Sequence, residues 1–259
     1  MSGILFDKII FGPVNSRRLG KSLGINLLPE NLKVCSMNCI YCECGWGKYI
    51  ENFSSKLLPY KDITPVLRER FQQLHQNQVQ IDSITYSGNG EPTMHPHFAK
   101  INKVIIQLRD IYFPKTIITC LSNSTQFYKR TIMPALKSID NPLMKLDAGT
   151  QATFYLINKP FQKLSLDKVC ENLRYFDGEL SIQTLFLRGK LNNGKIVDNT
   201  SEEEVDAWLK RIKDINPRKV ILYSIDRETP AKYLEKIDEN TLNKIALQVR
   251  SLGIQAEVY

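Results

Sequence analysis

The sequence predicts an α/β fold, in which strands and helices alternate along the chain. Short runs rich in β-branched and apolar residues alternate with segments whose apolar residues recur at helical spacing. Six such strand–helix units in strict alternation imply a parallel sheet with right-handed crossovers. No linker rich in proline, glycine or serine interrupts them. We therefore expect a single domain over residues 1–259.

The elements follow in order after a lead-in at residues 1–22, where glycines and a proline predict irregular loop. The expected strands are at 23–29, 81–86, 116–121, 142–147, 180–187 and 219–225, with a short closing strand at 254–258. The expected helices are at 63–78, around 101–108, and at 126–136, 166–173, 205–212 and 242–252. Ser165 can cap one helix, and Ser201 with Glu204 forms a capping box at another.

The composition is that of a soluble globular protein, with 42% hydrophobic and 24% charged residues. The formal net charge of +8 is compatible with a nucleic-acid partner, and also with a lysine-rich solvated surface. The N-terminus lacks a basic region followed by an apolar one, and no run approaches the roughly 18 apolar residues of a membrane span. We expect a cytoplasmic protein with no membrane association.

Four of the six cysteines lie within ten residues, as Cys35, Cys39, Cys42 and Cys44. The first three are spaced C-x3-C-x2-C, and thiolates are soft ligands that suit iron–sulfur clusters or zinc. Three thiolates would hold three irons of a [4Fe–4S] cluster and leave the fourth iron free for another ligand. Structural zinc usually draws its ligands from two separated knuckles, and no second knuckle exists here. The spacing favours iron–sulfur, while Cys44 remains a candidate fourth ligand, redox partner or inert thiol.

Polar and glycine-rich residues also follow the predicted strands, at 88–91, at 122–123, and at Lys145 and Asp147. The carboxyl ends of strands in a barrel of βα units share one face, where ligands bind. A glycine turn lets backbone groups approach a ligand closely, and the Glu91 carboxylate can bind an ammonium group. Taken singly, these features are also consistent with an ordinary turn, a helix cap and a buried ion pair.

The C-x3-C-x2-C spacing with Tyr41 before the third cysteine resembles the signature of the radical S-adenosylmethionine (radical SAM) superfamily. The resemblance covers nearly the whole chain and implies a partial (β/α)6 TIM-like barrel, with the cluster loop after the first strand. The stretch Gly88-Asn89-Gly90-Glu91-Pro92 is similar to the family's Gly-Gly-Glu-type motif, with Asn89 as a variant. The resemblance implies that one electron from the reduced cluster cleaves SAM, and that the 5′-deoxyadenosyl radical then abstracts a substrate hydrogen.

Site roles follow from the same resemblance. Cys35, Cys39 and Cys42 would hold the cluster, and Tyr41 would lie against the adenine of SAM. The turn of Gly88, Asn89, Gly90 and Glu91 would receive the methionine amino group. The remaining contacts, to ribose or carboxylate, are expected from Ser122, Asn123, Lys145, Asp147 and Gln183.

Three further stretches, residues 12–20, 87–93 and 157–160, resemble an uncharacterised group of iron–sulfur oxidoreductases that is similar to tRNA wyosine synthases. This likeness implies a tRNA substrate and an electron donor of flavodoxin or ferredoxin type. Two other interpretations stay open. One is an activase that installs a glycyl radical on a partner protein, and the other is a non-catalytic iron–sulfur or zinc protein that binds RNA.

Overall fold

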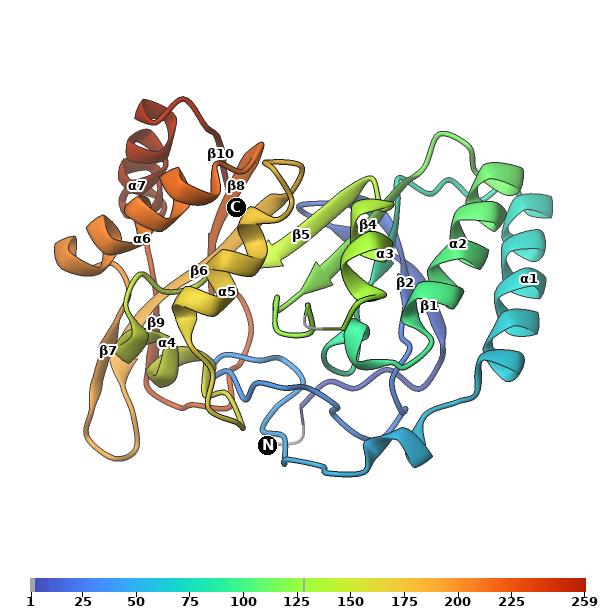
Figure 1. Cartoon of the computed structure of the whole chain (residues 1–259), viewed down its shortest axis with the longest axis horizontal. Helices are drawn as coiled ribbons and strands as arrows, with labels where there is room; N and C mark the ends of the chain where they lie inside the picture. The colour runs from blue at the N-terminus through green and yellow to red at the C-terminus, as the bar shows by residue number, and fades with distance from the viewer. Residues whose placement is uncertain (1–2, 128) are drawn as a thin grey trace.

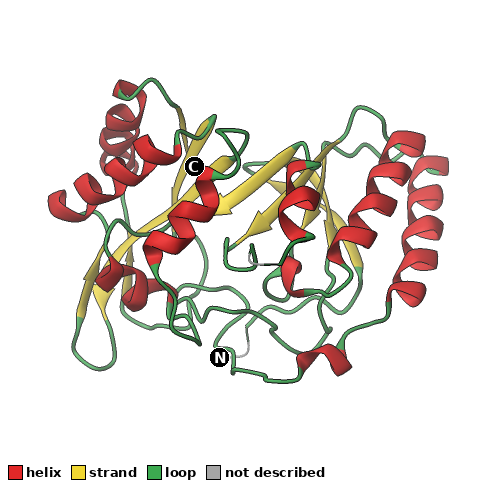
Figure 2. Cartoon of the chain, in the orientation of Figure 1, coloured by secondary structure: helices red, strands yellow, loops and turns green. Residues whose placement is uncertain are grey.

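A curved, mostly parallel sheet with helices along its outer side confirms the predicted α/β class (Figures 1 and 2). The computed structural model describes residues 3–127 and 129–259. The strands run in the order β1-β2-β3-β4-β5-β6-β8-β10, and from β2 onward every neighbouring pair on this path is parallel. These strands are β1 Ile10–Ser16, β2 Gly20–Ile25, β3 Ser83–Tyr86, β4 Ile117–Ser122, β5 Asn141–Lys145, β6 Ser181–Lys190, β8 Lys219–Ser224 and β10 Gln255–Val258.

The helices bury the faces that their spacing predicts. They are α1 Tyr60–Gln76, α2 Phe98–Tyr112, α3 Ile132–Lys137, α4 Gln151–Asn158, α5 Leu166–Arg174, α6 Glu202–Ile215 and α7 Glu239–Ser251, with short 3-10 turns at Phe53–Lys56 and Pro92–Met94. In α1, Leu67, Phe71 and Leu74 are almost fully buried, as expected from their i, i+4, i+7 positions. None of the helices described is long and apolar enough to cross a membrane.

The prediction that residues 1–22 form an irregular lead-in is wrong from Ile10 onward; residues 3–9 are irregular as expected, and residues 1–2 lie outside the described residues. Strand β1 pairs antiparallel with β2, and the register shifts between Phe11 and Val14, at a bulge that takes up Gly12 and Pro13. The glycine and proline that suggested loop therefore lie in a bulged edge strand. Across the hairpin the ring of Phe11 lies on Gly24, where an added Cβ would come within 2.0 Å of a ring carbon.

Three further elements have no counterpart in the prediction. Helix α4 follows β5, and the two short strands β7 Ile196–Asp198 and β9 Leu234–Lys236 pair antiparallel with the far end of β6. Strand β6 is thereby longer than expected, and Figure 1 shows β7 and β9 beside its end. These strands are too short for residue alternation to indicate them.

Only one of the two hydrogen bonds of the predicted capping box forms at the start of α6. Ser201 accepts a hydrogen bond from the Glu204 backbone N–H at 3.4 Å, as predicted. The Glu204 carboxylate instead accepts from the backbone N–H groups of Gly149 (2.5 Å) and Thr150 (3.1 Å). It thus anchors the turn between β5 and α4, close to the carboxyl end of the sheet.

Candidate functional site

The C-x3-C-x2-C stretch lies in the long loop after β2, where its backbone bonds to two distant segments. Val34 bridges to Gly90 in the turn after β3, and Met37 bridges to Pro160 just beyond α4. The N–H of Asn38 donates to the Asn158 carbonyl at 3.1 Å. Through these backbone contacts, residues 157–160 support the cysteine loop.

Polar donors surround the sulfur atoms of the first two cysteines. Asn123 donates its amide N–H to Cys35 Sγ at 3.4 Å. Cys39 Sγ receives the Asn158 amide at 3.5 Å and lies 3.8 Å from the Lys145 ammonium. Burial raises the pKa of the Cys35 thiol to about 12. A metal that binds there would therefore release protons from thiols that are neutral without it.

These sulfur atoms fit a cluster better than a single ion. In residues 3–127 and 129–259, no three His, Cys, Asp or Glu side chains are grouped so that they could hold one metal ion. A [4Fe–4S] cluster does not need its three cysteine ligands to meet at one metal ion, because each thiolate binds a different iron. All six cysteines are free of disulfides, and N–H groups aimed at cysteine sulfur are the partners that such clusters use.

Cys42 and Cys44 form the third part of the loop. A hydrogen bond from the Cys44 thiol and the nearby Lys33 ammonium, acting against burial, lower the pKa of Cys42 to about 5. Cys44 Sγ also lies 3.2 Å from the Gly88 carbonyl oxygen, which is the alternative acceptor for its single thiol proton. Cys44 therefore joins the cysteine loop to the turn after β3, whichever of its three candidate roles applies.

The turn after β3 approaches this loop closely because it contains glycines. Gly88 and Gly90 have φ angles of 125° and 137°, which favour glycine. An added Cβ on Gly90 would come within 1.9 Å of the Val34 carbonyl oxygen. Asn89, the variant position, is fully buried and donates to the carbonyls of Phe6 (2.8 Å) and Pro29 (2.7 Å). The asparagine thus ties the turn to the N-terminal segment.

The Glu91 carboxylate joins the ends of β3 and β4. It accepts from Thr93 Oγ1 (2.5 Å), Ser122 Oγ (2.9 Å) and the Asn123 backbone N–H (2.6 Å). Burial raises the pKa of Glu91, although these hydrogen bonds oppose the shift. Ser122 and Asn123 are consequently brought to the turn, as the sequence predicts, and they are placed there by Glu91.

A second network connects Tyr41 with the end of β5. The Tyr41 hydroxyl donates to Asp147 Oδ2 at 2.5 Å, and the Asn158 amide donates to the same oxygen at 2.7 Å. Lys145 pairs with Asp147 at 3.1 Å and also contacts the Tyr41 hydroxyl. Burial opposes the charge of Lys145, but Asp147 and Cys39 outweigh it and raise the pKa of the ammonium well above its usual value. The ion pair considered as an alternative for Lys145 and Asp147 is therefore present.

The last of the predicted site residues is Gln183, in strand β6. Gln183 accepts from Arg18 Nη1 at 2.9 Å, and the Arg18 guanidinium lies 4.3 Å above the ring centre of Tyr223. Lys33 and Asn158 also lie at the site, and neither was among the residues predicted for it. Only the likeness of the stretch 157–160 to an iron–sulfur group pointed toward Asn158, and no sequence pattern pointed to Lys33.

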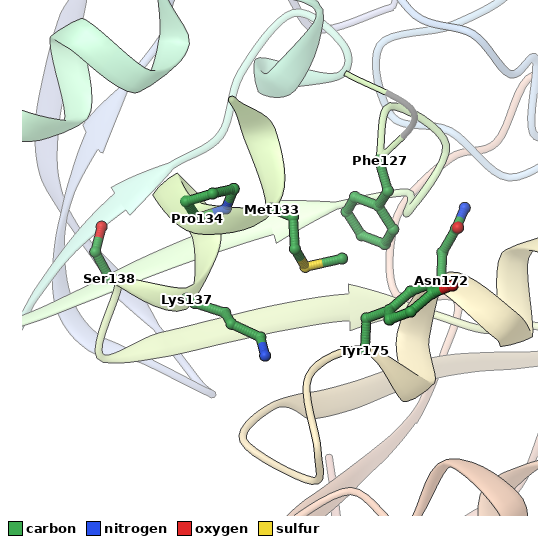
Figure 3. A pocket seen from close by; sticks show the side chains of 7 residues that line it. All are labelled: Phe127, Met133, Pro134, Lys137, Ser138, Asn172 and Tyr175. Carbon is green, nitrogen blue, oxygen red and sulfur yellow. The ribbon is translucent and has the colours of Figure 1, made fainter. Parts of the chain in front are cut away.

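Two cavities differ in their relation to the cysteines. One of about 320 Å³ is lined by Cys35 and Ser36, and by Tyr49, Phe161, Lys48 and Lys163. A larger one of about 630 Å³ lies between α3 and α5, where Phe127, Met133 and Tyr175 line it (Figure 3). Its lysine, Lys137, pairs with Asp177 at 3.1 Å. Only the smaller cavity touches the cysteine loop, so we take it as part of the site.

The Radical SAM superfamily, a relative and a solved structure each match more than half of this chain. The Radical SAM superfamily matches residues 32–187. Over 251 residues the chain is 33% identical to a UPF0026 protein of Helicobacter pylori strain J99, covering 95% of this chain and 75% of that protein. The structure of a radical SAM methyltransferase from Sphaerobacter thermophilus superposes with a TM-score of 0.63 at 12% identity, over 92% of this chain and 65% of the other.

A protein of Brachyspira hyodysenteriae named GTPase Obg is 34% identical over 244 residues, which cover 93% of this chain and 33% of that protein. This chain therefore spans about a third of that relative. Gly20-Lys21-Ser22 lies within strand β2, whereas a P-loop leads from a glycine-rich turn into a helix. The name of that relative is not a guide to this site.

The family match and the geometry describe the same region. Residues 32–187 include the cysteine loop, the turn after β3 and the ends of β4 and β5. Radical SAM enzymes use a [4Fe–4S] cluster and S-adenosylmethionine, and three free cysteines, of which Cys35 and Cys39 have amide donors on their sulfur atoms, suit the cluster. The chain belongs to the radical SAM superfamily, and its cofactors are a [4Fe–4S] cluster and SAM.

Proposed function

We propose that this protein is an enzyme that reductively cleaves SAM at a [4Fe–4S] cluster held by Cys35, Cys39 and Cys42. The observation that carries the proposal is the contact of the cysteine loop with both neighbouring strand ends, through Val34 to Gly90 and through Cys35 to Asn123. When bound, the reduced cluster would give one electron to SAM, whose sulfur–C5′ bond would break to methionine and a 5′-deoxyadenosyl radical that would take a hydrogen atom from substrate.

The chain's own residues hold and shield these cofactors. Because Gly88 and Gly90 lack side chains, the turn after β3 packs closely against Asn26 and Val34, and this packing holds at the cysteine loop the turn that would receive the methionine part of SAM. Asn123 extends from the end of β4 toward Cys35 and Ser36, where it can orient a polar ligand. Tyr41 is held by Asp147, so its ring has one position beside Cys39 and Lys145.

The proposal also includes an electron donor of flavodoxin or ferredoxin type, and a cytoplasmic location for the enzyme.

Replacing Cys42 by alanine is expected to abolish SAM cleavage, because one iron of the cluster loses its thiolate. The measurement is 5′-deoxyadenosine released under dithionite after anaerobic reconstitution, together with iron per protein. Cys170→Ala is the matched control, since Cys170 lies in helix α5 against Arg211 and away from the cysteine loop. The wild-type protein and the control should both bind about four irons.

The same experiment separates the alternative class of function. A protein that binds one zinc and releases no 5′-deoxyadenosine would be a non-catalytic metal protein, and the enzyme proposal would be wrong. Equal cleavage by Cys42→Ala and wild type would contradict the assignment of the cluster ligand.

For the substrate, we propose an RNA of the tRNA class. The cavity beside Cys35 combines the aromatic rings of Tyr49 and Phe161 with Lys48 and Lys163 at its edge. Unstacked bases bind aromatic rings, and lysines bind the phosphates that connect them. The net charge of +8 is consistent with such a partner. A nucleotide turned out of its stack would reach the cysteine loop through this cavity.

The double substitution Lys48→Gln/Lys163→Gln is expected to weaken tRNA binding and to reduce its dependence on salt. Each lost phosphate contact lowers the slope of log K against log salt by about 0.7 to 0.9. Binding is measured by fluorescence anisotropy at several salt concentrations. Lys244→Gln, on the exposed side of α7, is the single-charge control and should leave the slope unchanged. An unchanged slope in the double variant would remove the cavity from the RNA-binding surface.

A further inference from the structure

Asn158, the last residue of helix α4, contacts the cysteine loop around Cys39. The backbone N–H of Asn38 donates to the Asn158 carbonyl at 3.1 Å. The backbone N–H of Ile40 donates to the Ile157 carbonyl at 2.9 Å. Between these two bonds, the side-chain amide of Asn158 donates to Cys39 Sγ at 3.5 Å. The loop on both sides of Cys39 is thus attached to the end of α4, which fixes the position of the N–H···S contact.

The neighbouring Asp147 determines which end of the Asn158 amide faces the sulfur. Asn158 Nδ2 also donates to Asp147 Oδ2 at 2.7 Å, and an ionised carboxylate can only accept hydrogen bonds. Turning the amide over would place its oxygen against both the carboxylate and the sulfur. The two N–H groups of the amide are therefore both used, one for Asp147 and one for Cys39.

The amide oxygen of Asn158 indicates that this side chain serves through its donors. Oδ1 is buried and has no hydrogen-bond partner within residues 3–127 and 129–259. An unsatisfied buried acceptor is costly, and leucine would fill a similar volume without that cost. Leucine, however, has no N–H group for Cys39 or Asp147. The asparagine therefore provides N–H groups at this position, at the expense of an unpaired oxygen.

Solvent has little access to this N–H···S bond. The exposed fraction is 1% for Asn158 and 6% for Cys39. Cys35 differs, because it lines the cavity of about 320 Å³, whereas Cys39 is not among the described residues that line it. Water that enters such a cavity can replace a lost donor. At Cys39 the bond lies in a medium of low dielectric constant, where a hydrogen bond is stronger and water does not substitute for it.

We propose that the Asn158 amide raises the reduction potential of the [4Fe–4S] cluster through Cys39, and so makes the cluster easier for its electron donor to reduce. When the cluster takes up one electron, its thiolates become more negative. A hydrogen bond to a cluster sulfur stabilises this reduced state more than the oxidised one. Asn158 acts through Cys39 and is therefore a positioning residue. The proposal rests on the cluster of the proposed function.

The test compares Asn158→Leu with wild type in an anaerobic redox titration of the reconstituted full chain without SAM. Leucine fills the buried volume, excludes water and removes both N–H groups. We expect the ratio of reduced to oxidised cluster at a fixed potential to fall at least threefold, which corresponds to about 28 mV at about 59 mV per tenfold change. Electron–nuclear double resonance of the reduced cluster should also lose one exchangeable proton coupling that the wild type shows.

Tyr41→Phe is the matched control, because the Tyr41 hydroxyl donates to the same oxygen of Asp147 at 2.5 Å. This variant removes a donor from Asp147, as Asn158→Leu does, but it keeps the bond to Cys39. Its potential and its exchangeable proton coupling should therefore match those of the wild type. An equal fall in potential in Tyr41→Phe would overturn the proposal, because the effect would then come from Asp147.

Should Asn158→Leu fail to bind iron, Asn158→Ala removes the same donor without steric demand. A donor-free variant with about four irons and the wild-type potential would overturn the proposal. If neither variant binds iron while the wild type does, Asn158 is needed to hold the cluster rather than to adjust its potential, and the proposal is wrong. Absence of iron in the wild-type protein would instead overturn the proposed function, and this proposal with it.

Discussion

Replacing Asp147 by alanine is expected to lower the free energy of unfolding of the cluster-free protein by about 3 to 5 kcal/mol. The Asp147 side chain is fully buried, and its Oδ2 accepts from the Tyr41 hydroxyl, Lys145 and the Asn158 amide. Its Oδ1 accepts from the backbone N–H of Leu185 at 3.1 Å. Alanine would leave a largely buried ammonium and three neutral donors without their acceptor, and each unsatisfied donor adds to the cost.

Urea denaturation monitored by circular dichroism measures this loss. Asp177→Asn is the control, because Asp177 pairs with Lys137 at the surface with 82% of its side chain exposed, and asparagine tolerates the positive φ of 53° at this position. Removing an exposed ion pair should cost at most about 1 kcal/mol. Asp147→Asn should also destabilise the protein, because in either orientation of the side chain its N–H2 group would face hydrogen-bond donors. A loss for Asp147→Ala no larger than that of the control would show that the network contributes little to stability.

Replacing Glu91 by glutamine is expected to weaken SAM binding at least tenfold, a difference of about 1.4 kcal/mol. Glutamine has one oxygen and one N–H2 group where Glu91 has two acceptors. If its oxygen serves Ser122 and Thr93, its N–H2 group faces the Asn123 backbone N–H, which now donates at 2.6 Å. Hydrogen bonds to a charged group are worth about 1.5 to 3 kcal/mol each, so the end of β4 should shift away from the turn.

Equilibrium dialysis of SAM against the reconstituted protein measures this effect, and thermal unfolding shows whether each variant is folded. Glu43→Gln is the control, since Glu43 lies in the cysteine loop with half of its side chain exposed and pairs with Arg227 at 2.6 Å. Its loss should leave SAM affinity within twofold of wild type. Equal affinities for Glu91→Gln and wild type would mean that Glu91 does not position the SAM site.

The alternation of strands and helices was predictable because local patterns carry it. Leu67, Phe71 and Leu74 lie on one face of α1 at helical spacing, and an isolated segment shows that spacing as clearly as the folded protein does. The N-terminal hairpin was not predictable in this way. Gly12 and Pro13 indicate a loop unless a partner strand is known, and the pairing of Phe11 with Gly24 exists only after folding. Helix α4 was missed because its eight residues are too few for periodicity to indicate a helix.

For the site, the sequence by itself was enough to predict the candidate cluster ligands and the glycine turn. Short segments contain Cys35, Cys39 and Cys42 and the glycine turn at 88–91, so these features can be recognised in the sequence without a structure. The tertiary structure alone decided which side chains support them. Asn158 reaches Cys39 from 119 residues away, and the Glu91 carboxylate meets the Asn123 backbone from 32 residues away. Contacts between distant residues and the local dielectric depend on how the whole chain packs, and no local pattern encodes either.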